Sequence, residues 1–386
     1  MNKSKKALII IVAIIVLAGT GGAAAWYYYA NTTDTEQANT ASTSNATNIA
    51  ADDSDDIDWA SLPTTNVTLT DEGYAVTAAG TYVLSGSSTG QVTINTDSYV
   101  RLVLDGVTIK SSKGAAIYIE NAKKTVVQLA DGSTNTVEDA ATRSDEDIDG
   151  AIYSSDDLVI NGSGSLTVTA NFADGIVGKD DLWITAGNVT VTSVDDGIRG
   201  KDSLNISGGT IVINAKGDGM KASNDTDLGK GQLVIAGGDI TISSGDDAIK
   251  AEQKISITGG TINIKTSVEG IEAPVIVIDD GTITLYASDD GINASASAII
   301  TSGLSITING GTMTIEVGPG DTDAIDSNGD LYVNGGTISI TAQVSSFDFD
   351  GNGAINGGTV TVNGQRITEM PQQMMGGGGM GGGPQR

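Results

Sequence analysis

A tetrapeptide that recurs about every 22 residues constrains the fold of this chain more than any other feature. It reads Asp-Gly-Ile-x in its clearest copies. Most copies are evenly spaced, and the two longest gaps precede Ile249 and Ile325. A fixed period in this range is typical of solenoids, in which each repeat forms one coil and stacks on its neighbours. The apolar residues of the copies are Ile152, Ile176, Ile198, Met220, Ile249, Ile271, Ile292, Ile325 and Phe347.

A second signature follows the tetrapeptide, and it consists of two short alternating segments around a Gly-Gly pair. Clear copies are LNISGGTIVIN at 204–214 and LYVNGGTISIT at 331–341. The alternation is typical of β-strands with one buried face. A Gly-Gly pair can also close a β-hairpin, so the strands could stack in parallel or fold back. The period favours an all-β fold, a right-handed parallel β-helix with three short strands in each coil and insertions that bulge at the corners.

The amino-acid composition excludes several classes of chemistry. The 386 residues contain no Cys and no His, which removes disulfides, thiolate nucleophiles, imidazole catalysis and most zinc or iron sites. The formal net charge is −28, from 48 Asp+Glu against 20 Lys+Arg. The chain therefore lacks the basic face that binding to nucleic acid needs. A metal partner would be a hard cation that prefers oxygen, and calcium fits better than magnesium.

The N-terminal segment has the composition of a targeting sequence. Basic residues 2–6 precede a nearly apolar run at 7–19, and Trp26 and three tyrosines follow. We expect residues 1–30 to be a membrane anchor, because interfacial aromatics commonly flank such spans. A cleaved signal peptide is the alternative. Either interpretation places the remainder outside the cytoplasm, anchored at the cell surface or secreted.

Two further segments lack the residues that a packed core requires. Residues 31–62 read as a disordered linker rich in Ser, Thr, Asn and Asp. Residues 367–386 read as a disordered tail rich in Met and Gly. The domain built from the repeats is therefore expected at residues 63–366.

Stacking of the coils brings the acidic residue of every repeat into one row, with a spacing of about 4.8 Å. Like charges at this spacing repel, so the fold must neutralise them. Three solutions are open: the side chains cap backbone N–H groups at a turn, basic residues pair with them, or calcium binds them. The row consists of Asp174, Asp196, Asp218, Asp247, Glu269, Asp290 and Asp323.

We expect calcium in the later coils, where basic residues become scarce. The position after the repeat isoleucine is basic at Arg199, Lys221 and Lys250, and it is acidic or an amide from Glu272 onward. Acid-rich runs near the C-terminal end add oxygen ligands, although none has EF-hand spacing. The candidate calcium ligands are Asp246, Asp247, Glu269, Glu272, Asp289, Asp290, Asp321, Asp323, Asp326, Asp348 and Asp350.

The middle coils carry a strip of basic residues that could receive an acidic or polyhydroxy polymer. These residues could equally serve only to offset the acidic row. Trp183 is expected to point outward, where an aromatic ring can stack on a sugar, and Tyr332 is a second outward aromatic. The candidate polymer-binding residues are Lys179, Trp183, Arg199, Lys201, Lys221 and Lys250.

The linked motifs resemble a family of bacterial secreted carbohydrate-binding proteins with a parallel β-helix. The resemblance is carried by the Asp-Gly-Ile and Gly-Gly-Thr-Ile patterns, by DAIDSNGDLYVNGGT at 323–337, by FDFDG at 347–351 and by the Met-Gly tail. It implies a pectate-lyase-like fold, bound calcium, and binding of cellulose-like or polygalacturonate-like polysaccharides. The aromatic-flanked N-terminal segment departs from the pattern of that family.

Three functions fit these features. The first is a non-catalytic extracellular carbohydrate-binding protein, stabilised by calcium, monomeric, and attached to the membrane through its N-terminal segment. The second is a calcium-dependent pectate-type lyase, in which Lys221, Lys250 or Arg199 is the base that β-elimination requires. The third is a structural adhesin or an ice-binding solenoid, suggested by T-x-T strands such as Thr282/Thr284.

Overall fold

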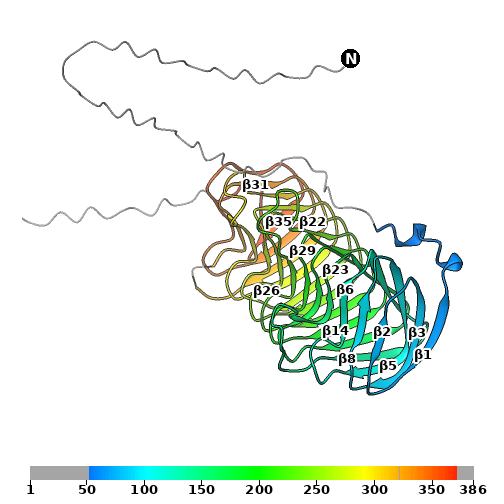
Figure 1. Cartoon of the computed structure of the whole chain (residues 1–386). Helices are drawn as coiled ribbons and strands as arrows, with labels where there is room; N and C mark the ends of the chain where they lie inside the picture. Colours follow the sequence, from blue (N-terminus) through cyan, green and yellow to red (C-terminus); the bar gives the residue numbers. More distant parts are fainter. Residues whose placement is uncertain (1–51, 321, 372–386) are drawn as a thin grey trace, which may run out of the picture. The chain divides into compact units, whose positions relative to one another are not determined.

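The described part of the chain is built almost entirely from β-strands. In the computed structural model it comprises residues 52–320 and 322–371. All its strands belong to two sheets, one of 12 strands and one of 24 (Figure 1). Two short 3-10 helices precede them, η1 (Ser54–Asp56) and η2 (Trp59–Ser61).

The 12-stranded sheet receives one strand from each coil, and every pairing in it is parallel. Its strands are β2 (Tyr74–Val76), β4 (Val92–Asn95), β6 (Ile117–Asn121), β9 (Gly150–Ser154), β12 (Asp174–Gly178), β15 (Ile198–Gly200), β18 (Met220–Ala222), β21 (Ile249–Ala251), β24 (Ile271–Glu272), β27 (Ile292–Ala294), β30 (Ile325–Ser327) and β33 (Asp348–Phe349).

The 24-stranded sheet consists of two ladders, because most coils contribute two strands to it. The first ladder contains β1 (Thr64–Leu69), β3 (Gly80–Ser88), β5 (Tyr99–Lys110), β7 (Lys124–Leu129), β10 (Leu158–Gly162), β13 (Asp181–Ile184), β16 (Ser203–Ile206), β19 (Gln232–Ile235), β22 (Lys254–Ile257), β25 (Val275–Ile278), β28 (Ser305–Ile308), β31 (Asp330–Val333) and β34 (Gly353–Ile355). The second ladder contains β8 (Thr134–Glu138), β11 (Ser165–Thr169), β14 (Asn188–Thr192), β17 (Thr210–Asn214), β20 (Asp239–Ser243), β23 (Thr261–Thr266), β26 (Thr282–Ala287), β29 (Thr312–Val317), β32 (Thr337–Thr341), β35 (Thr359–Val362) and β36 (Gln365–Ile367).

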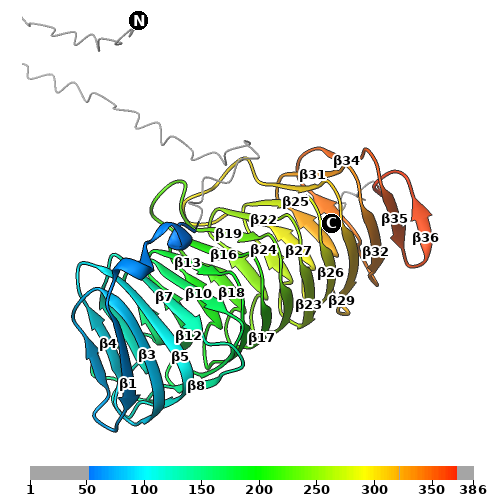
Figure 2. The ribbon, with the colours of Figure 1, turned by 90° about the vertical axis from the view of Figure 1, so that its right-hand side faces the viewer.

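Successive coils pair in register, so the sequence repeat maps directly onto the stack (Figure 2). Ile176 pairs with Ile198, and Ile198 pairs with Met220. The register survives the longest gap in the repeat, since Ile292 still pairs with Ile325. The predicted parallel β-helix, with one coil for each sequence repeat, is therefore confirmed, and the extra residues lie outside the paired strands.

The Gly-Gly signature marks a bend between the two ladders and does not close a hairpin. Strands β16 and β17 flank Gly208 and Gly209, yet β16 pairs only with β13 and β19, one coil away on each side. Gly209 has a φ of +89°, and a Cβ there would lie 2.8 Å from the carbonyl oxygen of Gly187. The hairpin alternative is wrong because β16 and β17 pair in parallel with strands of the neighbouring coils and not with each other. The second glycine supplies a left-handed bend packed on the coil below.

Columns of branched aliphatic side chains fill the interior. In β16 and β17 the residues Leu204, Ile206, Ile211 and Ile213 are at most 1% exposed, as their alternation predicts. The same columns extend through every coil and form one continuous hydrophobic cluster. The interior is therefore a packed core, and any ligand site must lie on the outer faces or at the corners.

Residues 52–62, named here the N-terminal strap, lie against the outer face of the first ladder. Trp59 packs on a small apolar cluster of Val126, Val159 and Trp183. Lys124, which is 5% exposed, forms an ion pair with Asp53 of the strap. This end of the expected linker is thus held by specific contacts, in contrast to the disorder that its composition suggests.

The second ladder ends in a β-hairpin formed by β35 and β36. After β35 the backbone turns at Asn363 and Gly364, whose φ values are 50° and 79°. Strand β36 then pairs antiparallel with β35. Both residues of this turn have positive φ, as a two-residue hairpin loop of type I′ requires.

Several sequence expectations concern residues outside the described range. They are the anchor or signal at 1–30, most of the linker at 31–62, and most of the tail at 367–386. Among residues 52–320 and 322–371, none of the helices combines the length and the apolar character that crossing a bilayer requires.

Candidate functional site

The acidic row lies where the chain enters the strands of the 12-stranded sheet, and in Asp174, Asp196, Asp218, Asp247 and Asp290 one carboxylate oxygen accepts a hydrogen bond from backbone. Asp174 Oδ1 accepts a hydrogen bond from the N–H of Asp196, one coil later, at 3.0 Å. Asp196 and Asp218 accept the equivalent bonds from the next coils at 2.9 and 3.0 Å, and Asp290 continues the pattern at 2.8 Å. The row therefore fulfils the capping role that the sequence allows, but the donor belongs to the neighbouring coil.

The other carboxylate oxygen binds a cation in the middle coils. Arg199 lies 2.6 Å from Asp174 Oδ2, and Lys221 lies 2.6 Å from Asp218 Oδ2. Lys250 binds Asp247 at 2.7 Å. Arg199, Lys221 and Lys250 form one column, because Arg199 pairs with Lys221 and Lys221 with Lys250 across the strands. In this strip the acidic row and the basic column neutralise each other.

The remaining expected polymer contacts lie elsewhere. Lys179 and Lys201 follow β12 and β15 at the corner, and Lys179 Nζ is 6.0 Å from the ring centroid of Tyr153. Trp183 is only 4% exposed, beneath Trp59, and Lys124 Nζ lies 4.6 Å from its ring centroid. The expectation of an accessible Trp183 is therefore wrong, because the N-terminal strap covers it.

The basic column ends at Lys250 and the same column continues with oxygen-bearing side chains. Lys250 pairs with Glu272, Glu272 with Asn293, and Asn293 with Asp326. Asp348 follows Asp326. Lys250 also reaches Glu272 at 2.5 Å, so Glu272, a candidate calcium ligand from the coils where basic residues become scarce, still has a basic partner. Beyond Glu272 the described part of this column contains no basic side chain.

Asn293 lies in the part of the column where acidic and amide side chains have replaced the basic ones. It is 7% exposed, and its Nδ2 donates to both carboxylate oxygens of Glu269 at 3.1 Å. Its Oδ1 is buried and has no hydrogen-bond partner among the described residues. A buried acceptor without a donor costs about 1–3 kcal/mol. A cation at this position would remove that cost.

The carboxylates around Asn293 share an unfavourable electrostatic environment. Burial raises the pKa of Asp326 to about 7, and the charges of Asp290 and Asp348 contribute. Burial also raises the pKa of Asp290 to about 6, and that of Glu269 to about 8. These raised pKa values show that the ionised carboxylates have too little positive charge near them. A divalent cation would supply that positive charge.

The other expected calcium ligands occupy the rim of this region. Asp246 and Asp289 are exposed and stand just before the row, and Asp350 is exposed beyond β33. Carboxylate oxygens of Asp218, Asp246 and Asp247 lie within 4.8 Å of one another, as do those of Asp247, Glu269 and Glu272. Asp323 stands in the row itself, between Asp290 and Ser345. Asp321 lies outside the described residues.

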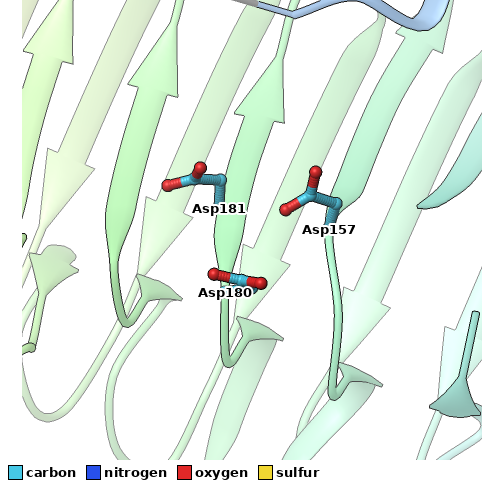
Figure 3. A group of neighbouring side chains, drawn as sticks. All are labelled: Asp157, Asp180 and Asp181. Carbon is cyan, nitrogen blue, oxygen red and sulfur yellow. The ribbon is translucent and has the colours of Figure 1, made fainter. Parts of the chain in front are cut away.

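A further acidic group lies at the corner where the chain enters the first ladder, and the sequence analysis missed it. Oxygens of Asp157, Asp180 and Asp181 lie within 4.8 Å of one another (Figure 3). Burial and a hydrogen bond with Asp202 raise the pKa of Asp180 to about 7. The available signal was the DDL triplet at 156–158 and again at 180–182.

A family model for carbohydrate-binding domain-containing proteins matches residues 70–322. The chain belongs to this family. The matched segment contains the whole basic column and Asn293, while Asp323, Asp326, Asp348 and Asp350 lie beyond it. The resemblance seen in the repeat motifs is thereby confirmed.

Two proteins illustrate the similarity of this carbohydrate-binding domain. A carbohydrate-binding domain-containing protein from Acetivibrio thermocellus is 44% identical over 124 residues, which are 30% of this chain and 43% of that protein. The match thus spans less than half of the relative. A solved polysaccharide lyase-like protein from C. thermocellum, a gadolinium derivative, has 34% identity and a TM-score of 0.49, and covers 53% of this chain and 96% of that chain.

The geometry bears directly on the three basic residues considered as lyase bases. Burial alone would lower the pKa of Lys250, but the hydrogen bonds and charges of Asp247 and Glu272 outweigh it and raise the pKa well above its usual value. Lys221 and Arg199 have pKa values raised in the same way by their carboxylates. A general base must be unprotonated near the working pH. The raised pKa values keep these three side chains protonated.

Proposed function

We propose that the carbohydrate-binding domain is a non-catalytic, extracellular polysaccharide-binding module whose later coils are stabilised by calcium. The single observation that carries the calcium proposal is the change in the outer column of the 12-stranded sheet. Cations up to Lys250 give way to Asn293, Asp326 and Asp348, with the buried Oδ1 of Asn293 unpartnered among the described residues. Membrane attachment or, as the alternative, secretion, together with a monomeric state, remains part of the proposal.

Calcium suits these donors better than other biological metals. It accepts six to eight oxygens from carboxylates, amides, carbonyls and water in flexible geometry, whereas magnesium needs a tight octahedron. The region supplies amide and carboxylate oxygens, and the chain has no His or Cys to attract softer metals. A calcium ion that retains open positions can also bridge to the carboxylates of a uronate polymer. That property supports polygalacturonate-like ligands beside cellulose-like ones.

Sedimentation with insoluble polysaccharides tests the binding proposal. We expect the full chain to be retained on at least one cellulose-like or pectin-like polymer, and retention on the acidic polymer to fall when EDTA replaces calcium. Incubation with polygalacturonate should release no ultraviolet-absorbing unsaturated product. Absence of retention on every polymer tried in calcium would contradict the function, and formation of that product would revive the lyase alternative.

A thermal shift with calcium tests the metal part separately. Calcium should raise the Tm of the wild-type chain, and Asp326→Asn should reduce this increase because it removes a charged ligand from the proposed site. Asp239→Asn, an exposed change on β20, is the control and should retain the full increase. Equal responses in both variants would argue against a site at Asp326.

The threonine rows behind the ice-binding alternative do exist as columns. Thr282, Thr312, Thr337 and Thr359 are consecutive partners on the second ladder. Exposed threonine is also an ordinary outward strand residue, so this arrangement favours no ligand by itself. Thermal hysteresis of the purified chain would distinguish an ice-binding function.

A further inference from the structure

The insertion in the longest repeat gap builds a wall on the outer face of the first ladder. Residues 295–304 follow β27 and precede β28. Their apolar side chains, Ile299, Ile300 and Leu304, are buried together with Val275 and Val277 of β25. The two valines have the alternating spacing of outward positions, so this part of the face is covered rather than solvated.

Beside this wall lies a pocket of about 540 Å³. Two outward rows form its floor, and both follow from the strand register. One row runs from Val275 through Ser305 to Asp330, and the other from Val277 through Thr307 to Tyr332. The floor therefore crosses three coils, or roughly 10 Å between the outer two strands. The remaining lining residues are Lys254, Thr301, Ser302, Gly303, Leu304, Asn328 and Gly329.

Tyr332 gives the pocket a fixed aromatic surface. Its hydroxyl lies 3.4 Å from Asp330 Oδ2. Asp330 is itself held by the N–H of Asn352, which donates to Oδ1 at 2.8 Å. The ring is partly exposed at the end of an otherwise polar and aliphatic floor. This combination of an aromatic face with nearby hydroxyl, carboxylate and ammonium groups provides both stacking and hydrogen bonding.

The charge of the pocket differs from that of the chain. The chain has a net charge of −28, whereas among the described residues the pocket is lined by one charged side chain of each sign, Lys254 and Asp330. An anionic polymer would approach it against the field of the whole molecule. An uncharged polymer would meet no such barrier.

We propose that this pocket binds a short segment of an uncharged polysaccharide, with one sugar ring stacked on Tyr332 and its hydroxyls hydrogen-bonded to Asp330, Ser305 and Thr307. The proposal rests on the proposed polysaccharide-binding function and assigns to it a second surface, independent of calcium. The 12-stranded sheet would serve cation-bridged acidic chains, and the walled pocket on the first ladder would serve neutral ones.

Titration calorimetry of the full chain with cellohexaose, xylohexaose and mannohexaose tests the proposal. We expect at least one of the three to bind, with an affinity unchanged by EDTA and by raised ionic strength, since the ligand has no charge to screen. Tyr332→Ala should weaken that binding about tenfold through loss of the stacked ring. Tyr332→Phe keeps the ring and should keep most of the affinity.

Tyr286→Ala provides the matched control, because Tyr286 is an outward tyrosine on β26 in the second ladder, away from the pocket. It should leave the affinity unchanged. Equal losses in Tyr286→Ala and Tyr332→Ala, or no loss in Tyr332→Ala, would overturn the pocket assignment. Binding of hexagalacturonate but of no neutral hexamer would also overturn it and leave the proposed function intact. Failure to bind any glycan would remove the proposed function itself.

Discussion

The two carboxylate oxygens of a repeat aspartate bind different groups. In Asp218, Oδ1 accepts the N–H of Asp247 on the next coil at 3.0 Å, and Oδ2 lies 2.6 Å from the ammonium of Lys221. One small side chain thus links two coils and also forms an ion pair with a lysine. The Asp-Gly-Ile motif therefore has a structural role in the middle coils, where both oxygens are satisfied. The proposed calcium site concerns the later coils, where the basic partner is missing.

Lys250→Met tests this structural role. Lys250 binds both Asp247 and Glu272, and removing one partner of a partly buried ion pair leaves the other charges uncompensated. We expect a loss of about 2 kcal/mol in the free energy of unfolding at pH 8, measured by denaturant titration. Lys201→Met is the control, since no ion pair of Lys201 is found among the described residues, and it should change stability by less than about 0.5 kcal/mol.

At the scale of the element, the bend between the ladders depends on a glycine, which in most coils is the second of a Gly-Gly pair and in one coil is Gly187 after Ala186. Gly187, Gly209, Gly238 and Gly260 all have φ between 89° and 105°. Each bend rests on the bend of the preceding coil, because a Cβ on Gly209 would meet the carbonyl oxygen of Gly187. The strands of a coil are therefore positioned by their glycines as well as by their aliphatic side chains.

Gly209→Ala should separate the steric effect of this contact from the effect of φ. Gly229 has almost the same φ, +88°, but a Cβ there would have nothing within 4 Å. Gly229→Ala should cost about 1 kcal/mol, the cost of a left-handed backbone for a non-glycine residue. Gly209→Ala should cost at least about 1 kcal/mol more, as measured by chemical denaturation. Equal losses of stability in the two variants would mean that the bend can shift to accept a Cβ at no extra cost.

The sequence predicts the elements of this fold well because its periodicity is local to each coil. Register followed from the spacing of residues such as Ile198 and Met220, since each strand only has to pair with the strand one period away. The candidate site was predicted less completely. The burial of Trp183 depends on Trp59, which lies several coils earlier in the sequence, and the pocket at Tyr332 depends on how residues 295–304 fold back. No periodic pattern contains such contacts.

At the scale of the whole molecule, the acidic side chains make stability depend on pH. Burial raises the pKa of Asp174 to about 7, that of Asp180 to about 7, and that of Glu269 to about 8. In the unfolded chain these groups titrate near 4. Between these values the folded state binds more protons than the unfolded state, so its stability falls as the pH rises from about 4 to about 8.

Thermal melts over this pH range test the expectation. In EGTA the Tm of the wild-type chain should be higher at pH 5.5 than at pH 8. Asp180→Asn, which mimics the protonated carboxyl, should raise the Tm at pH 8 and leave it nearly unchanged at pH 5. A Tm that increases with pH in EGTA would contradict the assignment of raised pKa values. Added calcium should reduce the difference, because it favours the ionised form.

The hairpin at Asn363 and Gly364 has a consequence for how molecules meet one another. A stack of parallel coils ends in a strand whose backbone N–H and C=O groups could pair with another chain, which is how fibrils grow. In the second ladder that edge is already occupied by β36, which runs in the opposite direction to every coil. A second molecule docking end to end would find no matching parallel template there. Two residues with positive φ thus place an antiparallel strand over one edge of a repeat that is otherwise parallel.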